Sequence, residues 1–322
     1  MTYIIAEVGS NFRTFENCVE CIELAAECGA DAVKFQKYDD VSLYGFDAGK
    51  DMAQYSIDGD WIPELSAHAK DLQIDFGVTF FNCEDVDKYG EYVDFFKIAS
   101  SDMNDHELFM AIKKKRTSLK KVYISTGGHT LLEIGNRYHI IKSHLSDNEF
   151  DFMYCDSSYP AESIDSKKVF DLFRMISQEP CISDHTVGIA KICLSNEMFK
   201  YNVVEKHVNL LDIRRRPDSG EFAISYNIFA DMVKKIKMTT AKPLEKTEDS
   251  VLKSEESMRL LHNRRLVAIK KIAKDDILKI GDNFGYFRGL APEKDYLEFH
   301  HIDVINGTEA TRDYGPGNSI TI

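Results

Sequence analysis

The sequence of 322 residues lacks any apolar run that approaches the ~18 residues of a membrane-spanning helix. Residues 1–7 have no basic flank, and Glu7 is a carboxylate where a secretion signal would be apolar. Positive charge is also scarce: 40 Lys and Arg stand against 53 Asp and Glu, for a net charge of −13. Such a surface repels polyanions. We therefore expect a cytoplasmic protein that binds neither a membrane nor nucleic acid.

Cysteine occurs in an odd number, seven, without paired metal-binding motifs. Cys18 and Cys21 form a C-x-x-C, but no second pair completes a zinc site. We expect these residues to be reduced thiols, as in proteins of reducing compartments. Hydrophobic residues make up 43% of the chain and charged residues 29%, which is typical of a globular protein with a full core.

Short apolar runs alternate with longer amphipathic segments over residues 1–241. The short runs predict buried strands at residues 3–8, 32–36, 75–79, 95–98, 121–125, 150–154, 181–184 and 203–207. The helical spacing of the longer segments predicts helices at 15–28, 63–72, 84–89, 106–114, 131–143, 165–176, 190–200 and 225–238. Eight strand–helix units favour an α/β fold of the (β/α)8 TIM-barrel type over its competitor, an open doubly wound sheet.

Three further segments differ from this alternation. Residues 39–60 form a polar, glycine-containing insertion, which is either a lid over a site or a plain loop. Residues 242–260 are charged and poor in apolar side chains, so they predict a linker. Residues 261–322 have shorter spacing and frequent glycines, and they predict a small, mostly β second domain.

Polar side chains follow nearly every predicted strand at its carboxyl end, the face where barrel enzymes build their sites. Lys34 and Lys97 bring two ammonium groups to this face. Hydroxyl groups accompany them, so together they predict a phosphate-binding cradle in an otherwise acidic protein. The hydroxyl residues are Thr79, Ser100, Ser125 and Ser183.

His185 and His207 end neighbouring strands, and two imidazoles so placed either share a divalent metal or are hydrogen-bonded rim residues. Glu205 and Asp184 are candidate partners for the two rings. Glu7 and Asp102 are the carboxylates that we expect to move protons.

Six ordered motifs on these strand ends resemble the sialic acid synthase family, which includes the N-acetylneuraminate, pseudaminic acid and legionaminic acid synthases. They are IIAEVGSN (4–11), GADAVKFQ (29–36), FKIAS (96–100), STG (125–127), SDHT (183–186) and EKH (205–207). The segment RRLVA (264–268) resembles the start of that family's antifreeze-like domain, known as the SAF domain. The resemblance spans nearly the whole chain.

The resemblance implies a transferase that condenses phosphoenolpyruvate with an N-acylated hexosamine and releases phosphate. It implies a domain-swapped homodimer and a divalent metal, Mn²⁺ or else Mg²⁺ or Co²⁺, held by His185 and His207. Lys34, Lys97 and the four hydroxyls would bind phosphoenolpyruvate, and Glu7 would act near the reacting centre. The sugar would be faced by Gln36, Asp102, Ser157, Tyr159, Asp218 and, from the partner subunit, Arg288.

The departures from the family pattern fall on the sugar side. Asp102 stands where the family commonly has Glu, and Ser157 stands where it has Asn. Arg215-Arg216-Pro217-Asp218 replaces a Pro-Gly-Pro-Asp segment. These changes leave the acceptor sugar open.

Two other functions remain open from the residues themselves. An aldolase or lyase would use Lys34 or Lys97 as a Schiff-base nucleophile. A non-catalytic relative would keep the fold and bind a sugar without turning it over.

Overall fold

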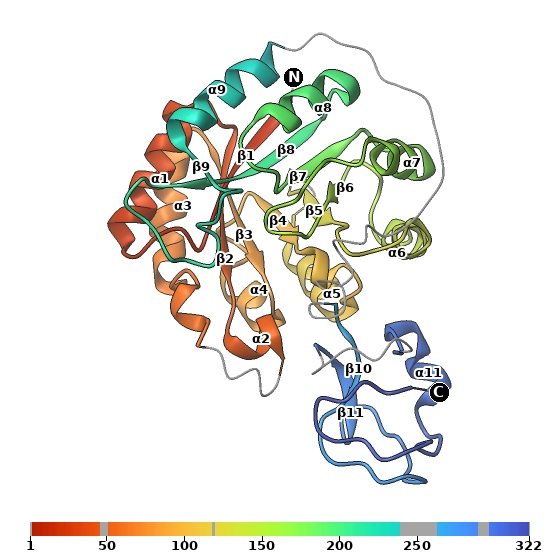
Figure 1. Ribbon diagram of the computed structural model, residues 1–322. Helices are drawn as coiled ribbons and strands as arrows, with labels where there is room; N and C mark the ends of the chain where they lie inside the picture. Colours follow the sequence, from red (N-terminus) through yellow and green to blue (C-terminus); the bar gives the residue numbers. More distant parts are fainter. Residues whose placement is uncertain (1, 46–50, 118–119, 239–262, 289–295, 322) are drawn as a thin grey trace.

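The computed structural model describes residues 2–45, 51–117, 120–238, 263–288 and 296–321. Eight parallel strands pair in sequence order, and the first also pairs with the eighth, so the sheet closes into a barrel (Figure 1). This confirms the (β/α)8 prediction over the open sheet. The strands are β1 (Tyr3–Gly9), β2 (Ala32–Lys37), β3 (Asp75–Phe80), β4 (Phe95–Ile98), β5 (Val122–Ser125), β6 (Phe150–Cys155), β7 (Cys181–Asp184) and β8 (Val203–Asn209).

Helices connect these strands and cover the outside of the barrel (Figure 1). Several begin at the side-chain caps that their sequences provide: Asn82, Asp105 and Asp165 each accept a backbone N–H of the first turn. The apolar stripe of each helix packs on the strands. The helices are α1 (Phe15–Glu27), α3 (Ile62–Asp71), α4 (Cys83–Tyr89), α5 (His106–Lys115), α6 (Leu131–Lys142), α7 (Ser166–Ile176), α8 (Ala190–Phe199) and α9 (Tyr226–Lys237).

The insertion between β2 and α3 is partly helical. It contains α2 (Asp40–Tyr44), η1 (Ala53–Tyr55) and η2 (Gly59–Trp61). The Asp40 carboxylate accepts hydrogen bonds from the backbone N–H groups of Met52 and Ala53, which ties the two sides of the insertion together. Leu43 and Met52 reach the pocket described below, so the insertion covers part of it.

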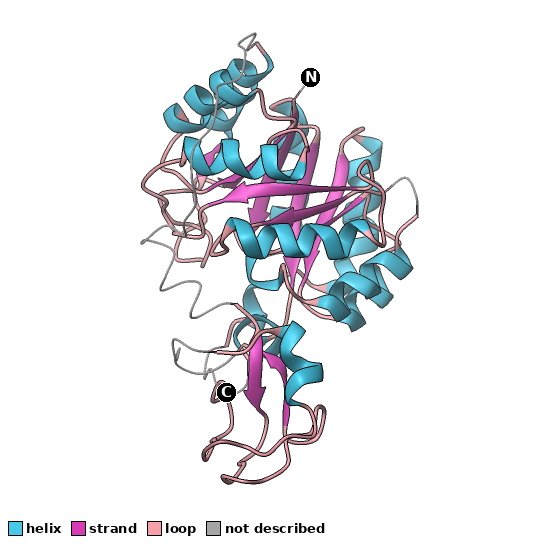
Figure 2. Ribbon diagram, turned by 90° about the vertical axis from the view of Figure 1, so that its right-hand side faces the viewer, coloured by secondary structure: helices cyan, strands magenta, loops and turns pink. Residues whose placement is uncertain are grey.

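A second hydrophobic cluster lies outside the barrel core and includes Leu266, Phe284, Tyr314 and Ile320. It is built on β10 (Arg265–Ala268) and the antiparallel β11 (Phe284–Phe287), with η5 (Phe299–His301) and α11 (Ile302–Ile305) beside them. Figure 2 shows this unit as a separate lobe beside the barrel. The predicted linker at residues 242–260 lies outside the described residues.

All seven cysteines are free thiols, as the sequence predicted, and Cys18 and Cys21 are buried on α1. Within the described ranges, no helix is both long and apolar enough to cross a bilayer.

Candidate active site

The register of the barrel places the polar strand-end residues side by side around one ring. Glu7 is the partner of Lys34 on β2 and of His207 on β8. Ser183 on β7 is the partner of Glu205 on β8. Because each pair sits on adjacent parallel strands, groups that are far apart in sequence meet at one end of the barrel.

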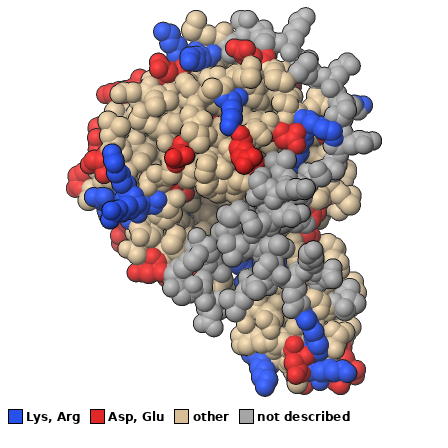
Figure 3. All heavy atoms as spheres, viewed as in Figure 1, with Lys and Arg blue, Asp and Glu red and all other residues tan. Residues whose placement is uncertain are grey.

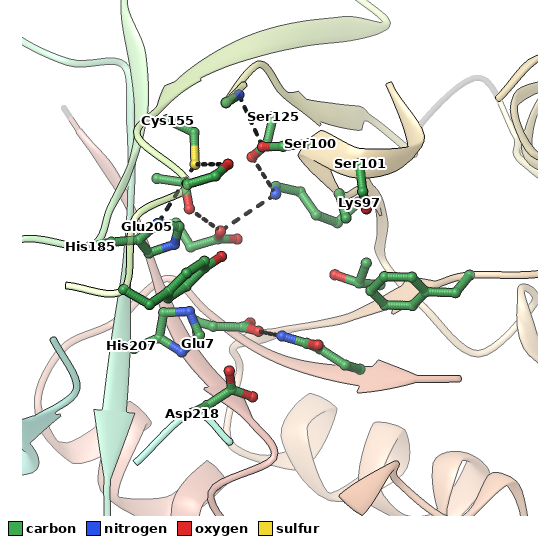
Figure 4. A pocket seen from close by; sticks show the side chains of 18 of the residues that line it. Glu7, Lys97, Ser100, Ser101, Ser125, Cys155, His185, Glu205, His207 and Asp218 are labelled. Carbon is green, nitrogen blue, oxygen red and sulfur yellow. Dashed lines mark hydrogen bonds and ion pairs between the residues drawn. The ribbon is translucent and has the colours of Figure 1, made fainter. Parts of the chain in front are cut away.

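These side chains line a cavity of about 290 Å³ at the carboxyl ends of the strands (Figure 4). All but two of the residues predicted for the site lie in its wall. Those in the wall are Glu7, Lys34, Gln36, Thr79, Lys97, Ser100, Ser125, Ser157, Tyr159, Ser183, His185, His207 and Asp218. The two others, Asp102 and Arg288, are buried behind it.

Lys34 is fixed on one side of the cavity. Its Nζ lies 2.6 Å from Glu7 Oε2 and donates a hydrogen bond of 2.8 Å to Thr79 Oγ1. Burial lowers the pKa of this ammonium, but Glu205 and Glu7 outweigh burial and raise it overall. Lys34 therefore stays charged at neutral pH.

Lys97 faces the cavity from the next strand but one. Its Nζ donates to Ser125 Oγ at 2.7 Å and lies 3.5 Å from Glu205 Oε1. Burial lowers the pKa of Lys97, because Glu205 compensates only in part. An anion that enters the cavity would supply the missing negative charge.

Glu205 lies between the two lysines, with Oε2 3.7 Å from Lys34 Nζ. Ser183 Oγ donates to its Oε1 at 2.6 Å. Burial acts to raise the pKa of Glu205, but Lys34 and Lys97 outweigh it and hold the pKa at about 2. Sequence reasoning assigned Glu205 to a histidine; instead it is the fixed negative charge of the lysine pair.

Glu7 has the opposite character although it is only one strand away. Gln36 Nε2 donates to its Oε1 at 2.7 Å. Burial raises the pKa of Glu7 to about 7, and the nearby Lys34 compensates only in part. Of the two buried carboxyls, Glu205 is thus permanently ionised, whereas Glu7 exchanges its proton near neutral pH.

His185 and His207 face each other with ring centroids 5.4 Å apart. His185 Nδ1 lies 2.7 Å from the carbonyl oxygen of Asp156, so it carries the proton and leaves Nε2 as the acceptor. His207 Nδ1 is buried and has no hydrogen-bond partner among the described residues. Burial lowers the pKa of both rings, and neutral imidazole is the form that binds a metal.

Two imidazoles alone are not a complete ligand set for a metal ion. In the described part of the chain, no group of three or more His, Cys, Asp and Glu side chains is arranged to hold a metal ion. The orphaned ring nitrogen and the neutral rings fit a site whose other ligands come from substrate or water. Asp184, the other expected partner of the histidines, pairs with Lys206 at 2.7 Å instead.

Aromatic rings enclose the histidines on the outer side of the cavity. The Tyr159 ring lies 4.2 Å from the His185 ring, and Phe222 lies 5.1 Å from His207. Asp218 is held nearby, because the backbone N–H of Ser10 donates to its Oδ2 at 2.7 Å. Burial raises the pKa of Asp218.

Asp102 and Arg288 form a buried ion pair with each other. Arg288 Nη2 lies 2.9 Å from Asp102 Oδ2, and Arg264 Nε donates to Oδ1 at 2.8 Å. Arg288 also donates to Ser101 Oγ at 2.6 Å. The Asp102 carboxylate is paired with two guanidinium groups and is not among the residues that line the cavity, so its predicted proton transfer has no support from this geometry. The family resemblance implies that Arg288 reaches the sugar side from the partner subunit's small domain; in this single chain it contacts the barrel of its own chain.

Sequence reasoning missed several residues of the wall, among them Cys155, Asn263 and Ser101. Cys155 Sγ lies 3.7 Å from His185 Nδ1, and Asn263 Nδ2 lies 3.1 Å from His129 Nε2. Ser101 Oγ accepts the hydrogen bond from Arg288 Nη2. Cys155 is the last residue of β6, so its position at the carboxyl end of a strand could have identified it as a cavity residue. Asn263 follows the linker, and no local pattern marks it.

The closed barrel and the polar cavity at its carboxyl face define the class of protein: a (β/α)8-barrel enzyme. A model of the NeuB family matches residues 21–247. The chain therefore belongs to the NeuB family.

Named relatives cover nearly the whole chain. The N,N'-diacetyllegionaminic acid synthase of Campylobacter jejuni is 28% identical over 304 residues, which are 87% of this chain and 89% of that protein. The human N-acetylneuraminate-9-phosphate synthase is 25% identical over 311 residues, 88% of this chain and 84% of that protein. The crystal structure of SpsE, a spore coat polysaccharide biosynthesis protein of Bacillus subtilis, has a TM-score of 0.79 at 22% identity. It covers 99% of this chain and 93% of that one, and it shares the fold.

Proposed function

We propose that this enzyme condenses phosphoenolpyruvate with the open-chain aldehyde of an N-acylated hexosamine and releases phosphate. The product is a nonulosonic acid of the sialic type. The observation that carries the proposal is one cavity that joins two hydroxyl-bonded lysines to a pair of neutral histidines. The names of the relatives from Campylobacter jejuni and human support the same reaction class.

Phosphoenolpyruvate would bind at the lysine end of the cavity. Lys34 and Lys97 offer charge-assisted hydrogen bonds to its phosphate and carboxylate. Thr79 and Ser125 already accept hydrogen bonds from these lysines, and Ser100 accepts a hydrogen bond of 3.0 Å from the backbone N–H of Gly127. Holding two reactants in a reactive orientation can lower an activation barrier by on the order of 7–11 kcal/mol.

Glu7 would accept a proton from the water that adds to C2 of phosphoenolpyruvate once C3 has attacked the aldehyde. A pKa of about 7 suits a base that works at neutral pH. Gln36 orients the carboxylate, and Lys34 stabilises its ionised form. The tetrahedral intermediate then loses phosphate by cleavage of the C–O bond.

His185 and His207 would hold a divalent metal, for which Mn²⁺ is our choice ahead of Mg²⁺ and Co²⁺. Bound there, such an ion supplies Lewis-acid polarisation of the aldehyde oxygen. Gln36, Ser157, Tyr159 and Asp218 would face the sugar. A homodimer with exchanged second domains remains part of this proposal; the mass in solution tests it.

The test is phosphate release from phosphoenolpyruvate labelled with ¹⁸O at the bridging oxygen, with a panel of N-acylated mannosamines and 2,4-diacetamido-trideoxyhexoses. We expect the label in the released phosphate, because the C–O bond breaks. Borohydride trapping of a lysine adduct with a keto substrate would instead indicate an aldolase. Sugar binding without phosphate release from any acceptor would indicate a non-catalytic relative.

A further inference from the structure

The loop between β8 and β9 (Ile224–Ser225) carries three consecutive arginines, Arg214, Arg215 and Arg216, in a chain whose net charge is −13. Pro217 and Asp218, the next two residues, line the cavity. In Figure 3, viewed as Figure 1, basic side chains gather on the left flank at the place of this loop. Arg215 and Arg216 directly precede these two residues and therefore lie next to the sugar-facing wall of the cavity.

Arg216 is anchored beside this wall. Its guanidinium carbon lies 4.9 Å from the centre of the Tyr55 ring, which belongs to η1 of the insertion. Met52, three residues before Tyr55, also lines the cavity. Ser219 Oγ accepts from the backbone N–H of Arg216 at 2.9 Å and donates to its carbonyl, which fixes the turn. The stacked face leaves the N–H edge of the guanidinium for a ligand.

Arg215 has a backbone φ of 61°, in the left-handed region that a glycine would adopt without steric cost. The side chain is exposed. A charged residue in a conformation unfavourable for it suggests that the side chain has a use at this position.

The acidic neighbours do not neutralise the three arginines. Among the ion pairs of the described residues, none involves Arg214, Arg215 or Arg216. Asp212 and Glu221 are exposed at the two ends of the loop. The Asp218 carboxylate accepts from the backbone N–H of Ser10. The guanidinium groups thus carry positive charge that no ion pair in the described residues neutralises, in a place separate from Lys34 and Lys97 at the strand ends.

We propose that the acceptor sugar carries a phosphate ester at the end opposite its aldehyde, and that Arg215 and Arg216 bind this phosphate. The inference rests on the proposed function, which puts the aldehyde at the histidine pair and the rest of the sugar along Asp218 and Pro217. Planar guanidinium groups bind phosphate oxygens in pairs. The two arginines thereby select phosphorylated over neutral acceptors.

The test measures binding to the full chain with two unreactive probes, N-acetylmannosaminitol and its 6-phosphate, by calorimetry. Neither probe has an aldehyde, so no turnover is needed. Saturating phosphoenolpyruvate occupies Lys34 and Lys97, so that the probe phosphate cannot bind there. We expect the phosphorylated probe to bind at least tenfold more tightly to the wild type, and Arg216→Gln to remove most of this difference.

Arg215→Gly provides a second variant that removes a charge and relieves the backbone, so loss of folding does not explain its effect. It should also reduce the preference. Arg174→Gln, an exposed arginine near the end of α7, is the matched control and should leave the preference unchanged. Equal affinity of the wild type for both probes, or an unchanged preference in both loop variants, would overturn the proposal.

Turnover separates this inference from the proposed function. Phosphate release with neutral acceptors at a kcat/KM equal to or above that with phosphorylated ones overturns the arginine assignment and leaves the synthase reaction standing. If none of the acceptors supports phosphate release although the phosphorylated probe binds selectively, the synthase reaction is refuted and the arginine site is supported.

Discussion

Arg288 and Asp102 form a fully buried ion pair between the second domain and the barrel, with Nη2 3.0 and 2.9 Å from the two carboxylate oxygens. Their side chains are 1% and 0% exposed. Removing one member of such a pair leaves the other charge uncompensated in a low-dielectric setting.

Arg288→Ala should therefore lower the unfolding midpoint, with a loss on the order of 3 kcal/mol for breaking a buried pair. It should also raise the KM for the acceptor by tenfold or more and change the KM for phosphoenolpyruvate by less than about threefold. Thermal denaturation and steady-state kinetics measure the two effects. Lys270→Ala, which removes an exposed ion pair with Asp282, is the control. Equal rises in both KM values would count against a role of Arg288 on the sugar side.

The pH dependence of kcat/KM should report Glu7. A base must be deprotonated to act, so activity should rise with pH through about 7, the pKa to which burial raises this carboxyl. Glu7→Gln keeps the shape of the side chain and should lower kcat by about 10²–10⁴-fold. It should also abolish the rise near pH 7 in the residual activity. Glu205 remains ionised over this range, because its pKa is held at about 2, so it does not contribute to the rise of kcat/KM near pH 7. A Glu7→Gln protein with full activity and an unchanged rise of kcat/KM near pH 7 would contradict the assignment of Glu7 as the base.

Metal binding should depend on the two histidines. His207→Ala should weaken Mn²⁺ binding by tenfold or more, measured by the loss of the free-ion signal in electron paramagnetic resonance. Chelator treatment should abolish wild-type turnover, and Mn²⁺ should restore it. His68→Ala changes a half-buried histidine that pairs with Glu23 on the outside of the barrel, and it should leave binding intact. A His207→Ala protein that keeps wild-type turnover after chelator treatment would rule out a role of the metal in the reaction.

Gly9 and Asp218 are in such close contact that a methyl group does not fit between them. A Cβ on Gly9 would lie 2.4 Å from Asp218 Oδ2, and the φ of 57° is itself unfavourable for alanine. Gly9→Ala should displace the Asp218 carboxylate and raise the acceptor KM at least tenfold, with little change for phosphoenolpyruvate. Gly188→Ala is the matched control, because its φ of 66° brings the same strain but no atom lies within 4 Å of its Cβ. Equal kinetic losses in both variants would show that strain, and not the contact, is responsible.

The barrel was predictable because its strands are short apolar runs bounded by polar residues. For β4 and β7 the predicted and observed bounds coincide, and β2 differs only by the addition of Lys37. Period-two alternation then puts Glu205 and His207 on the same side of β8. The same alternation predicts that Glu205 faces the cavity, although its position two residues before His207 also suggested a partner of a histidine.

Contacts between distant segments were not predictable. Asp102 is separated from Arg288 by 186 residues, and nothing local indicates that two guanidinium groups occupy its carboxylate. The short helices α2 and η1 lie in a segment without hydrophobic periodicity, where polar caps such as Asp39 decide the structure. Long-range ion pairs and cap geometry depend on the assembled fold, which the spacing of apolar residues does not encode.

Arg288 also holds the insertion, because its Nη1 donates to the carbonyl oxygen of Ser42 on α2. The next residue, Leu43, is part of the cavity wall. A movement of the small domain that withdrew Arg288 would therefore also release this contact beside the cavity wall. The position of the small domain and the cover over the cavity are thus mechanically linked through a single guanidinium group.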